Sequence, residues 1–153
     1  MSAETTIETT TLKPVKILLI EDNPGDIALT KKALTKSKLA NNLDVVNDGE
    51  EALAFLRKEG KFASAARPDL ILLDLNLPKK SGVEVLAAIK SDEDLKRIPI
   101  VILTTSKKEE DILRSYNNYA NCYITKPVDL TQFQTIVNNI ENFWFSIVTL
   151  PTN

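Results

Sequence analysis

Residues 69–82 read DLILLDLNLPKKSG, and this stretch decides the fold. Four consecutive apolar residues, Leu70 to Leu73, run directly into a carboxylate at Asp74. A continuous apolar run is typical of a strand that is covered on both faces, as in a parallel sheet. A buried carboxylate is costly unless something pairs with it. Asp74 is therefore either a surface residue just past the strand or a residue positioned for chemistry.

The rest of the chain alternates between apolar segments and helical patterns. The other strand candidates are residues 15–20, 43–46, 98–103 and 122–125. Each expected helix begins with a capping residue, and four of these are followed three residues later by Glu or Gln, as in a capping box. The caps are Asn23, Asp48, Ser81, Ser106 and Asp129. This alternation predicts an α/β fold, with a doubly wound, five-stranded parallel sheet in the flavodoxin-like order 2-1-3-4-5 and five helices.

Composition excludes several functional classes. The 153 residues suffice for one domain, and a net charge of −2 gives no footprint for direct nucleic-acid binding. No apolar run approaches the ~18 residues of a membrane helix, and a single cysteine, Cys122, fits a reducing compartment, so we expect a cytoplasmic protein. The chain has no histidine, which excludes a Ser-His-Asp triad, a Cys-His pair and a histidine metal site.

Polar residues gather where the expected strands end. Glu21 and Asp22 follow the first strand, Asp74 the third, Thr104 the fourth and Lys126 the fifth. In a doubly wound sheet, ligands bind beyond the carboxyl ends of the strands, where the strand order reverses. Three carboxylates there repel one another, and one lysine does not balance them. The arrangement favours a hard divalent cation such as Mg²⁺, and it suits phosphoryl transfer to a carboxylate.

At these residues the chain resembles the receiver domain of two-component response regulators. The resemblance runs from about Val15 to Trp144, and Thr104 and Lys126 lie 30 and 52 residues beyond Asp74, the offsets of that family. Its motifs are IEDNPGD (20–26), LLDLNLPKKSG (72–82), ILTTS (102–106) and ITKPVD (124–129). More narrowly, the chain is similar to the small cyanobacterial regulators that serve phytochrome histidine kinases.

The resemblance implies a role for each residue at the strand ends. Asp74 is the expected phosphoacceptor. The implied Mg²⁺ ligands are Asp22, Asp74, the backbone carbonyl of Asn76, and Glu21 directly or through water. The residues expected to contact the phosphoryl group or to switch with it are Thr104, Lys126 and Tyr123. The resemblance also implies a cis peptide bond before Pro127.

The implied function is that of a single-domain response regulator. A partner histidine kinase, with a bacterial phytochrome as the candidate, phosphorylates Asp74, and the domain then changes its partner or dimer surface. It is not an enzyme, beyond slow loss of its own phosphoryl group. The alternatives are a pseudo-receiver that binds partners without phosphorylation, an aspartate-nucleophile phosphatase, and a flavin- or nucleotide-binding module. Against the last two, Asn76 stands where such phosphatases carry a second acid, and no glycine-rich phosphate loop occurs.

The two ends of the chain are expected to differ from the domain between them. Residues 1–13 are polar and threonine-rich and predict a disordered tail, residues 14–145 form the receiver domain, and residues 146–153 form a C-terminal extension. Apolar side chains near the C-terminus either fold back on the domain or form an interface. We expect a homodimer there, and the candidate contacts are Phe143, Trp144, Phe145, Ile147 and Val148.

Overall fold

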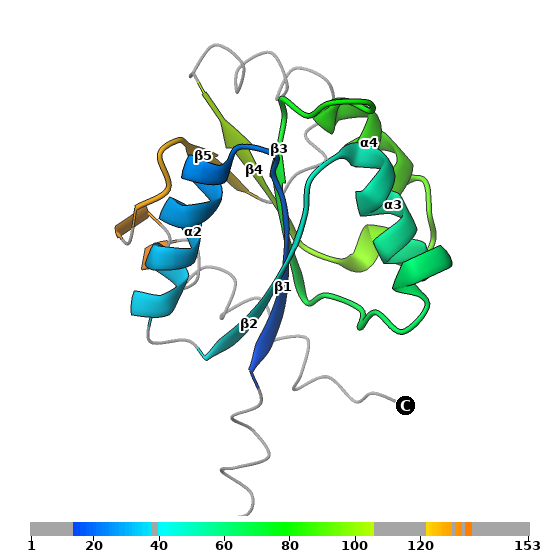
Figure 1. Cartoon of the computed structure of the whole chain (residues 1–153), viewed down its shortest axis with the longest axis horizontal. Coiled ribbons are helices and arrows are strands. Elements are labelled where there is room, and N and C mark those ends of the chain that lie inside the picture. The colour runs from blue at the N-terminus through cyan, green and yellow to red at the C-terminus, as the bar shows by residue number, and fades with distance from the viewer. Residues whose placement is uncertain (1–13, 38–39, 106–121, 130, 133, 136–153) are drawn as a thin grey trace, which may run out of the picture.

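One parallel sheet forms the centre of the computed structural model, which describes residues 14–37, 40–105, 122–129, 131–132 and 134–135 (Figure 1). Its strands are β1 (Val15–Ile20), β2 (Asn41–Val46), β3 (Leu70–Asp74), β4 (Ile100–Thr104) and β5 (Cys122–Thr125). All neighbours are parallel, and the order is β2-β1-β3-β4-β5. The predicted fold class and strand order are thus confirmed.

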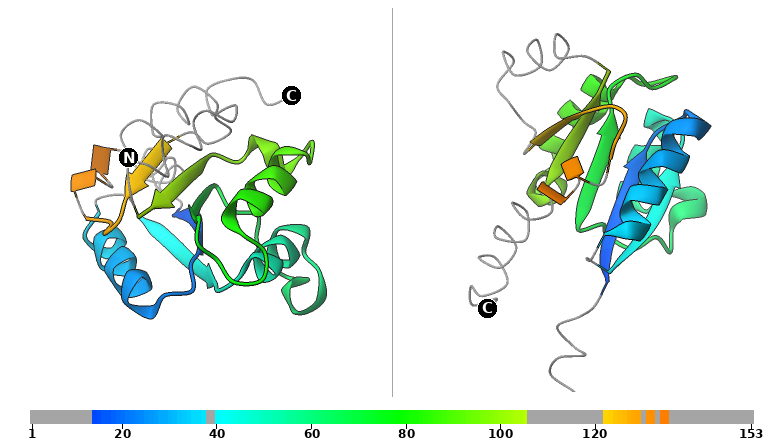
Figure 2. Two further views of the ribbon diagram at one scale, coloured as in Figure 1. Left: turned by 90° about the horizontal axis from the view of Figure 1, so that it is seen from above. Right: turned by 90° about the vertical axis from the view of Figure 1, so that its left-hand side faces the viewer.

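Helices cover both faces of the sheet. The α-helices within the described residues are α2 (Pro24–Lys36), α3 (Gly49–Arg57) and α4 (Gly82–Lys90), and the short 3₁₀ helices are η1 (Gly60–Phe62) and η2 (Leu95–Arg97). Figure 1 shows α2 on one side of the sheet and α3 with α4 on the other, and the right-hand view of Figure 2 shows α2 lying along its face. The central strands β3 and β4 and most of β1 are therefore screened from water on both sides, whereas edge strand β2 keeps exposed positions.

The continuous apolar runs follow from this double cover. Every residue of β3 and of β4 is buried. Successive side chains of a strand point to opposite faces. Accordingly, Ile71 and Leu73 enter one core cluster, with α3 and α4, while Leu70 and Leu72 enter the other, with α2. A strand that serves two cores needs apolar residues at every position.

The helix caps form, but the capping boxes at Asp48 and Ser81 differ from the expected pattern, since Glu84 Oε1 accepts from the Ser81 hydroxyl and not from the Ser81 N–H. The Asn23 side chain accepts a hydrogen bond from the Asp26 N–H at 2.9 Å, and Pro24 takes the first helical position. The Asp48 side chain accepts from the Glu51 N–H at 2.8 Å. In a capping box the Glu51 carboxylate would accept a hydrogen bond from the N–H of Asp48. It accepts instead from the N–H of Asn47, one residue earlier, at 3.0 Å.

Three strands have boundaries that differ from the predicted ones, and β4 also ends one residue later than expected, at Thr104. β2 starts at Asn41 and not at residue 43, because two polar asparagines pair with β1 at the sheet edge. β4 starts at Ile100 and not at residue 98, because Ile98 follows η2. β3 extends to Asp74 itself, which was expected beyond the strand.

Some predictions lie outside the described residues. They are the tail at 1–13, the fourth of the five expected helices with its cap at Ser106, and most of the fifth helix. The extension at 146–153 and the dimer candidates Phe143, Trp144, Phe145, Ile147 and Val148 also lie outside them. Within the part of the chain that is described, no helix has the length and apolar character needed to cross a membrane.

Candidate phosphoacceptor and metal site

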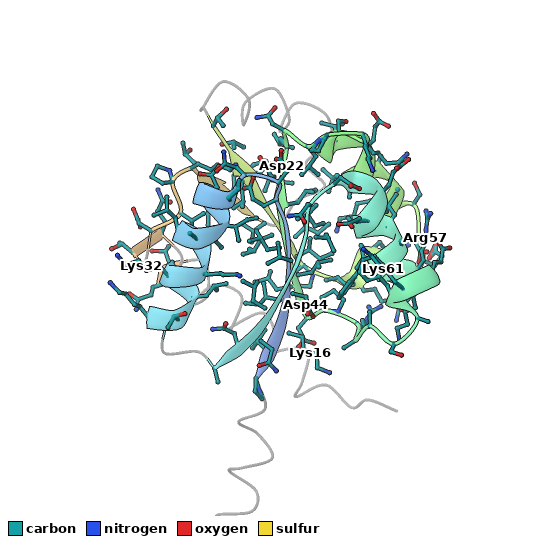
Figure 3. The ribbon with its side chains drawn as sticks, in the orientation of Figure 1. Lys16, Asp22, Lys32, Asp44, Arg57 and Lys61 are labelled. Carbon is teal, nitrogen blue, oxygen red and sulfur yellow. The ribbon has the colours of Figure 1, made fainter. Side chains whose placement is uncertain are left out.

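The strand ends named above meet at one edge of the sheet. In the register, Ile20 lies beside Leu73, Asp74 beside Leu103, and Thr104 beside Thr125. The residues that end or follow these strands therefore come to the same level. Figure 3 shows Asp22 at this edge, at the opposite end of β1 from Lys16.

Three carboxylates cluster at this edge. Glu21, Asp22 and Asp74 each offer an oxygen, and these oxygens lie within 4.8 Å of one another. Glu21 is 0% and Asp74 1% exposed, whereas Asp22 is exposed. The cluster therefore has a buried floor and an open side. Asp74 is the last residue of β3 and is buried, so the structure excludes the interpretation of it as a surface residue past the strand.

Lys126 supplies the positive charge within this site. Its Nζ lies 2.8 Å from Glu21 Oε1, 2.9 Å from Asp26 Oδ2 and 3.2 Å from Asp74 Oδ1. The contact with Glu21 lacks hydrogen-bond geometry and is an ion pair. The backbone N–H of Lys126 donates to the carbonyl oxygen of Thr104 at 2.7 Å, which ties the residue after β5 to the end of β4.

Burial and like charge shift the ionisation of this group of side chains. Burial, together with hydrogen bonding and charge from Asp74, raises the pKa of Glu21 from 4.5 to about 7, although Lys126 opposes the change. Burial lowers the pKa of Lys126, but its close contact with Glu21, its hydrogen bond to Asp26 and the charge of Asp74 outweigh this and raise that pKa overall. The Lys126 ammonium thus remains charged, but one positive charge does not balance the negative charge of the surrounding carboxylates.

The turn after β3 is held close to Asp74. The Asn76 N–H donates to Asp74 Oδ1 at 3.3 Å, and the Gly82 N–H donates to the Leu75 carbonyl oxygen at 3.0 Å. A Cβ at Gly82 would lie 2.5 Å from the Asp74 carbonyl oxygen and 2.6 Å from Leu75 Cα. Only glycine allows this approach, so the start of α4 fixes the backbone of the phosphoacceptor candidate.

The remaining predicted site residues surround this centre. Thr104 is fully buried, and its Oγ1 has no hydrogen-bond partner among the described residues. Tyr123 is half-buried and packs against the core cluster on the α3 and α4 face. The peptide bond between Lys126 and Pro127 is cis.

Asp26 is a member of the site that the sequence interpretation missed. It lies in the first turn of α2 and holds Lys126 across 100 residues of sequence. Its place three residues after the cap Asn23 is the signal that could have revealed it, since the start of a helix that follows a strand lies at the carboxyl edge of the sheet.

The donor set fits a hard divalent cation. All three clustered side chains offer carboxylate oxygens, which Mg²⁺ and Mn²⁺ accept. The exposed position of Asp22 leaves a side open for water or a phosphoryl oxygen. The chain's own cation, Lys126, already touches two of the three carboxylates, which shows that positive charge is accommodated here.

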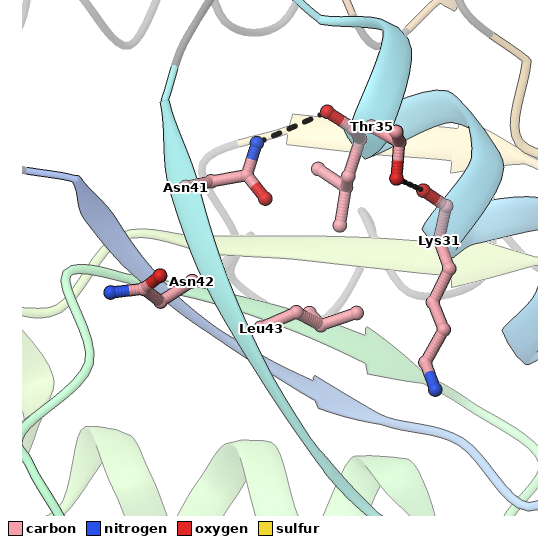
Figure 4. Close-up of a pocket in the computed structure, with 6 residues that line it drawn as sticks. Lys31, Thr35, Asn41, Asn42 and Leu43 are labelled. Carbon is pink, nitrogen blue, oxygen red and sulfur yellow. Dashed lines mark hydrogen bonds between the residues drawn. The ribbon is translucent and has the colours of Figure 1, made fainter.

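A separate groove of about 370 Å³ lies between α2 and β2 (Figure 4). It is lined by Lys31, Leu34, Thr35, Asn41, Asn42 and Leu43. Asn41 begins β2, so the groove is away from the carboxyl edge of the sheet. Asn41 Nδ2 donates to the Leu34 carbonyl oxygen at 3.1 Å and Thr35 Oγ1 donates to that of Lys31 at 2.8 Å, so these polar groups bond within the protein.

Known proteins are similar to this chain in sequence and in fold. The family model of the response regulator receiver domain matches residues 17–138. Response regulator Rcp1 of Synechocystis sp. is 49% identical over 138 residues, covering 90% of this chain and 94% of that protein.

Solved structures agree. The phosphorylated cyanobacterial phytochrome response regulator RcpA is 56% identical, with a TM-score of 0.73 over 92% of this chain and 100% of that one. The Mn²⁺-bound form of Rcp1 is 49% identical, with a TM-score of 0.72 over 91% of this chain and 100% of that one. The chain therefore belongs to the response regulator receiver domain family.

Proposed function

We propose that this receiver domain accepts a phosphoryl group on Asp74 from the phosphohistidine of a partner kinase, with Mg²⁺ bound beside it. The observation that carries the proposal is the position of Asp74. Its carboxylate is buried, it lies within 4.8 Å of two other carboxylates, and its Oδ1 is 3.2 Å from the Lys126 ammonium. A buried carboxylate that lies between an ammonium group and carboxylates able to hold a metal ion is placed to act as a nucleophile. A purely structural role would not need this surrounding.

The reaction conserves the phosphoryl group. An oxygen of the Asp74 carboxylate attacks phosphorus and forms a P–O bond, the P–N bond to the donor imidazole breaks, and the leaving nitrogen takes up a proton. Lys126 already touches Asp74, so its ammonium can pair with a phosphoryl oxygen without a long movement. A divalent cation held by Glu21, Asp22, Asp74 and the Asn76 carbonyl would offset the charge on the transferring group.

Thr104 is the proposed element that transmits the event. Its hydroxyl is buried and, within the described residues, unpartnered, which is costly unless another state supplies a partner. A phosphoryl oxygen on Asp74 is such a partner, because β4 lies directly beside β3. Movement of Thr104 would displace neighbouring β5 and half-buried Tyr123, which favours a second conformation of that surface.

The partner follows from chemistry and from the relatives. The chain has no histidine, so the phosphoryl group must come from another protein or a small donor. RcpA is described as a phytochrome response regulator, and we extend that association to a bacterial phytochrome kinase for this chain. The proposal includes a homodimer formed through the C-terminal residues, a cytoplasmic location, and no turnover beyond slow hydrolysis of the acyl phosphate.

Intact mass spectrometry tests the function. With acetyl phosphate and Mg²⁺, the wild-type chain should gain the mass of one phosphoryl group, while Asp74→Asn and a wild-type sample in EDTA should not. Asp48→Asn is a matched control, because it also removes a carboxylate near this edge but keeps the oxygen that caps α3. Failure of the wild-type chain to gain mass, from acetyl phosphate or from a phosphorylated kinase, would favour the pseudo-receiver alternative. Continuous release of phosphate from many donor molecules would favour a phosphatase.

A further inference from the structure

Lys126 has a third carboxylate partner that the phosphoryl chemistry does not use. Two of its partners, Glu21 and Asp74, belong to the cluster that fits a divalent cation. The third partner, Asp26, lies outside the cluster of Glu21, Asp22 and Asp74, yet it accepts a hydrogen bond from Lys126 Nζ at 2.9 Å. The ammonium thus lies within 3.2 Å of an oxygen from each of three carboxylates, and its contact with Asp26 has hydrogen-bond geometry.

Asp26 is held independently of the other carboxylates. It lies in the first turn of α2, where the helix begins at Pro24, and its backbone N–H donates to the Asn23 side chain at 2.9 Å. A negative charge is stabilised in the first turn of a helix. The Asp26 side chain is 31% exposed, compared with 11% for Lys126, so their contact lies at the rim of the site and not at its floor.

When a divalent cation binds, Glu21 and Asp74 affect the Lys126 ammonium differently from Asp26. Glu21 and Asp74 attract both the ammonium and a divalent cation, so the two cations compete for the same negative charge. Asp26 attracts the ammonium toward α2. Without Asp26, the ammonium would settle between Glu21 and Asp74 and neutralise the charge that a cation needs.

We propose that Asp26 is a positioning residue for Lys126: it anchors the ammonium at the α2 rim, beside Asp74, so that a divalent cation can enter the Glu21–Asp22–Asp74 cluster. This inference rests on the proposed function, because it assigns Asp26 a part in preparing the same site. It makes Asp26 important for metal affinity although Asp26 does not touch the metal. Its effect must therefore depend on the presence of Lys126.

A double-mutant cycle measured by calorimetric Mg²⁺ titration tests that dependence. Asp26→Asn should weaken Mg²⁺ binding about tenfold, a ratio that corresponds to about 1.4 kcal/mol and is close to the lower end of the range for one charged hydrogen bond. In a Lys126→Met background the same substitution should change affinity less than about threefold. Asp48→Asn is the charge control and should also stay below about threefold. An equal loss with and without Lys126, or no loss in either background, overturns the proposal.

A second readout needs no metal and separates this inference from the proposed function. In metal-free protein, NMR can detect a lysine ammonium that is held by hydrogen bonds, and Lys126→Met assigns that signal. Asp26→Asn should shift or broaden the Lys126 signal, and Asp48→Asn should leave it unchanged. An unchanged Lys126 signal in Asp26→Asn overturns the anchoring role even if wild-type protein binds Mg²⁺. If wild-type protein binds no Mg²⁺, the metal part of the function fails, and this signal still decides whether Asp26 anchors Lys126.

Discussion

Replacing Glu21 by glutamine should remove most of the pH dependence of stability in metal-free protein. In the folded state the pKa of Glu21 is raised from 4.5 to about 7, chiefly by burial. The folded state therefore favours the protonated acid. The stability that this protonation provides is present below pH 4.5 and is lost as pH rises toward 7. The difference between the two pKa values corresponds to about 3 kcal/mol of folding stability, of which about 2 kcal/mol is lost between pH 5 and 7.5.

The composition of the chain allows this pH dependence of stability to be assigned to Glu21. There is no histidine, so no other side chain has an ordinary pKa between pH 5 and 7.5. For a chain of this size, about 2 kcal/mol corresponds to about 4–8 °C in Tm. Urea denaturation in EDTA should show wild-type protein losing stability from pH 5 to 7.5, while Glu21→Gln stays nearly level.

Magnesium should reverse the effect. A bound cation favours the ionised form of Glu21, so added Mg²⁺ should stabilise the wild-type chain more at pH 7.5 than at pH 5. The reasoning is refuted if metal-free wild-type protein keeps the same stability across this range to within about 0.5 kcal/mol. A Glu21→Gln variant with the full wild-type slope would refute it equally, because the titrating group would then be another residue.

Other substitutions test the backbone and the switch. Gly82→Ala should lower the free energy of unfolding by about 1–3 kcal/mol, because the new Cβ would meet backbone atoms of Asp74 and Leu75. Gly25→Ala is the control, because its Cβ would meet only a side-chain oxygen at 3.2 Å. Equal midpoints of urea unfolding for the two variants would contradict this prediction. Thr104→Val should raise stability by about 1 kcal/mol, because it removes a buried hydroxyl that has no partner among the described residues. The same variant should still accept a phosphoryl group but lose the change in the Tyr123 NMR signal that follows it; loss of phosphorylation itself would oppose the switch role.

The sequence predicts the fold and the main site for a simple physical reason. Parallel strands covered on both faces need unbroken apolar runs, so the first polar residue after each run marks the carboxyl edge. Glu21, Asp74 and Lys126 are found in this way, and the parallel register then brings them together.

The features that the sequence does not predict depend on tertiary contacts. Asp26 joins the site only because α2 packs so that its first turn faces the end of β5, and the two partners are 100 residues apart. Asn41 and Asn42 lie in β2 despite low strand propensity, because pairing with β1 outweighs it at a sheet edge. Glu51 bonds to Asn47 and not to Asp48, a choice between neighbouring N–H groups that the capping pattern leaves open.

The most direct test of the central claim is to locate the acyl phosphate chemically. After treatment with acetyl phosphate and Mg²⁺, borohydride reduction converts a phosphorylated aspartate to homoserine, which tandem mass spectrometry can place in the sequence. The account predicts homoserine at residue 74 in the wild-type chain and at no other aspartate. Reduction at Asp22 or Asp26, or no reduced residue in protein shown to have gained phosphoryl mass, would contradict it.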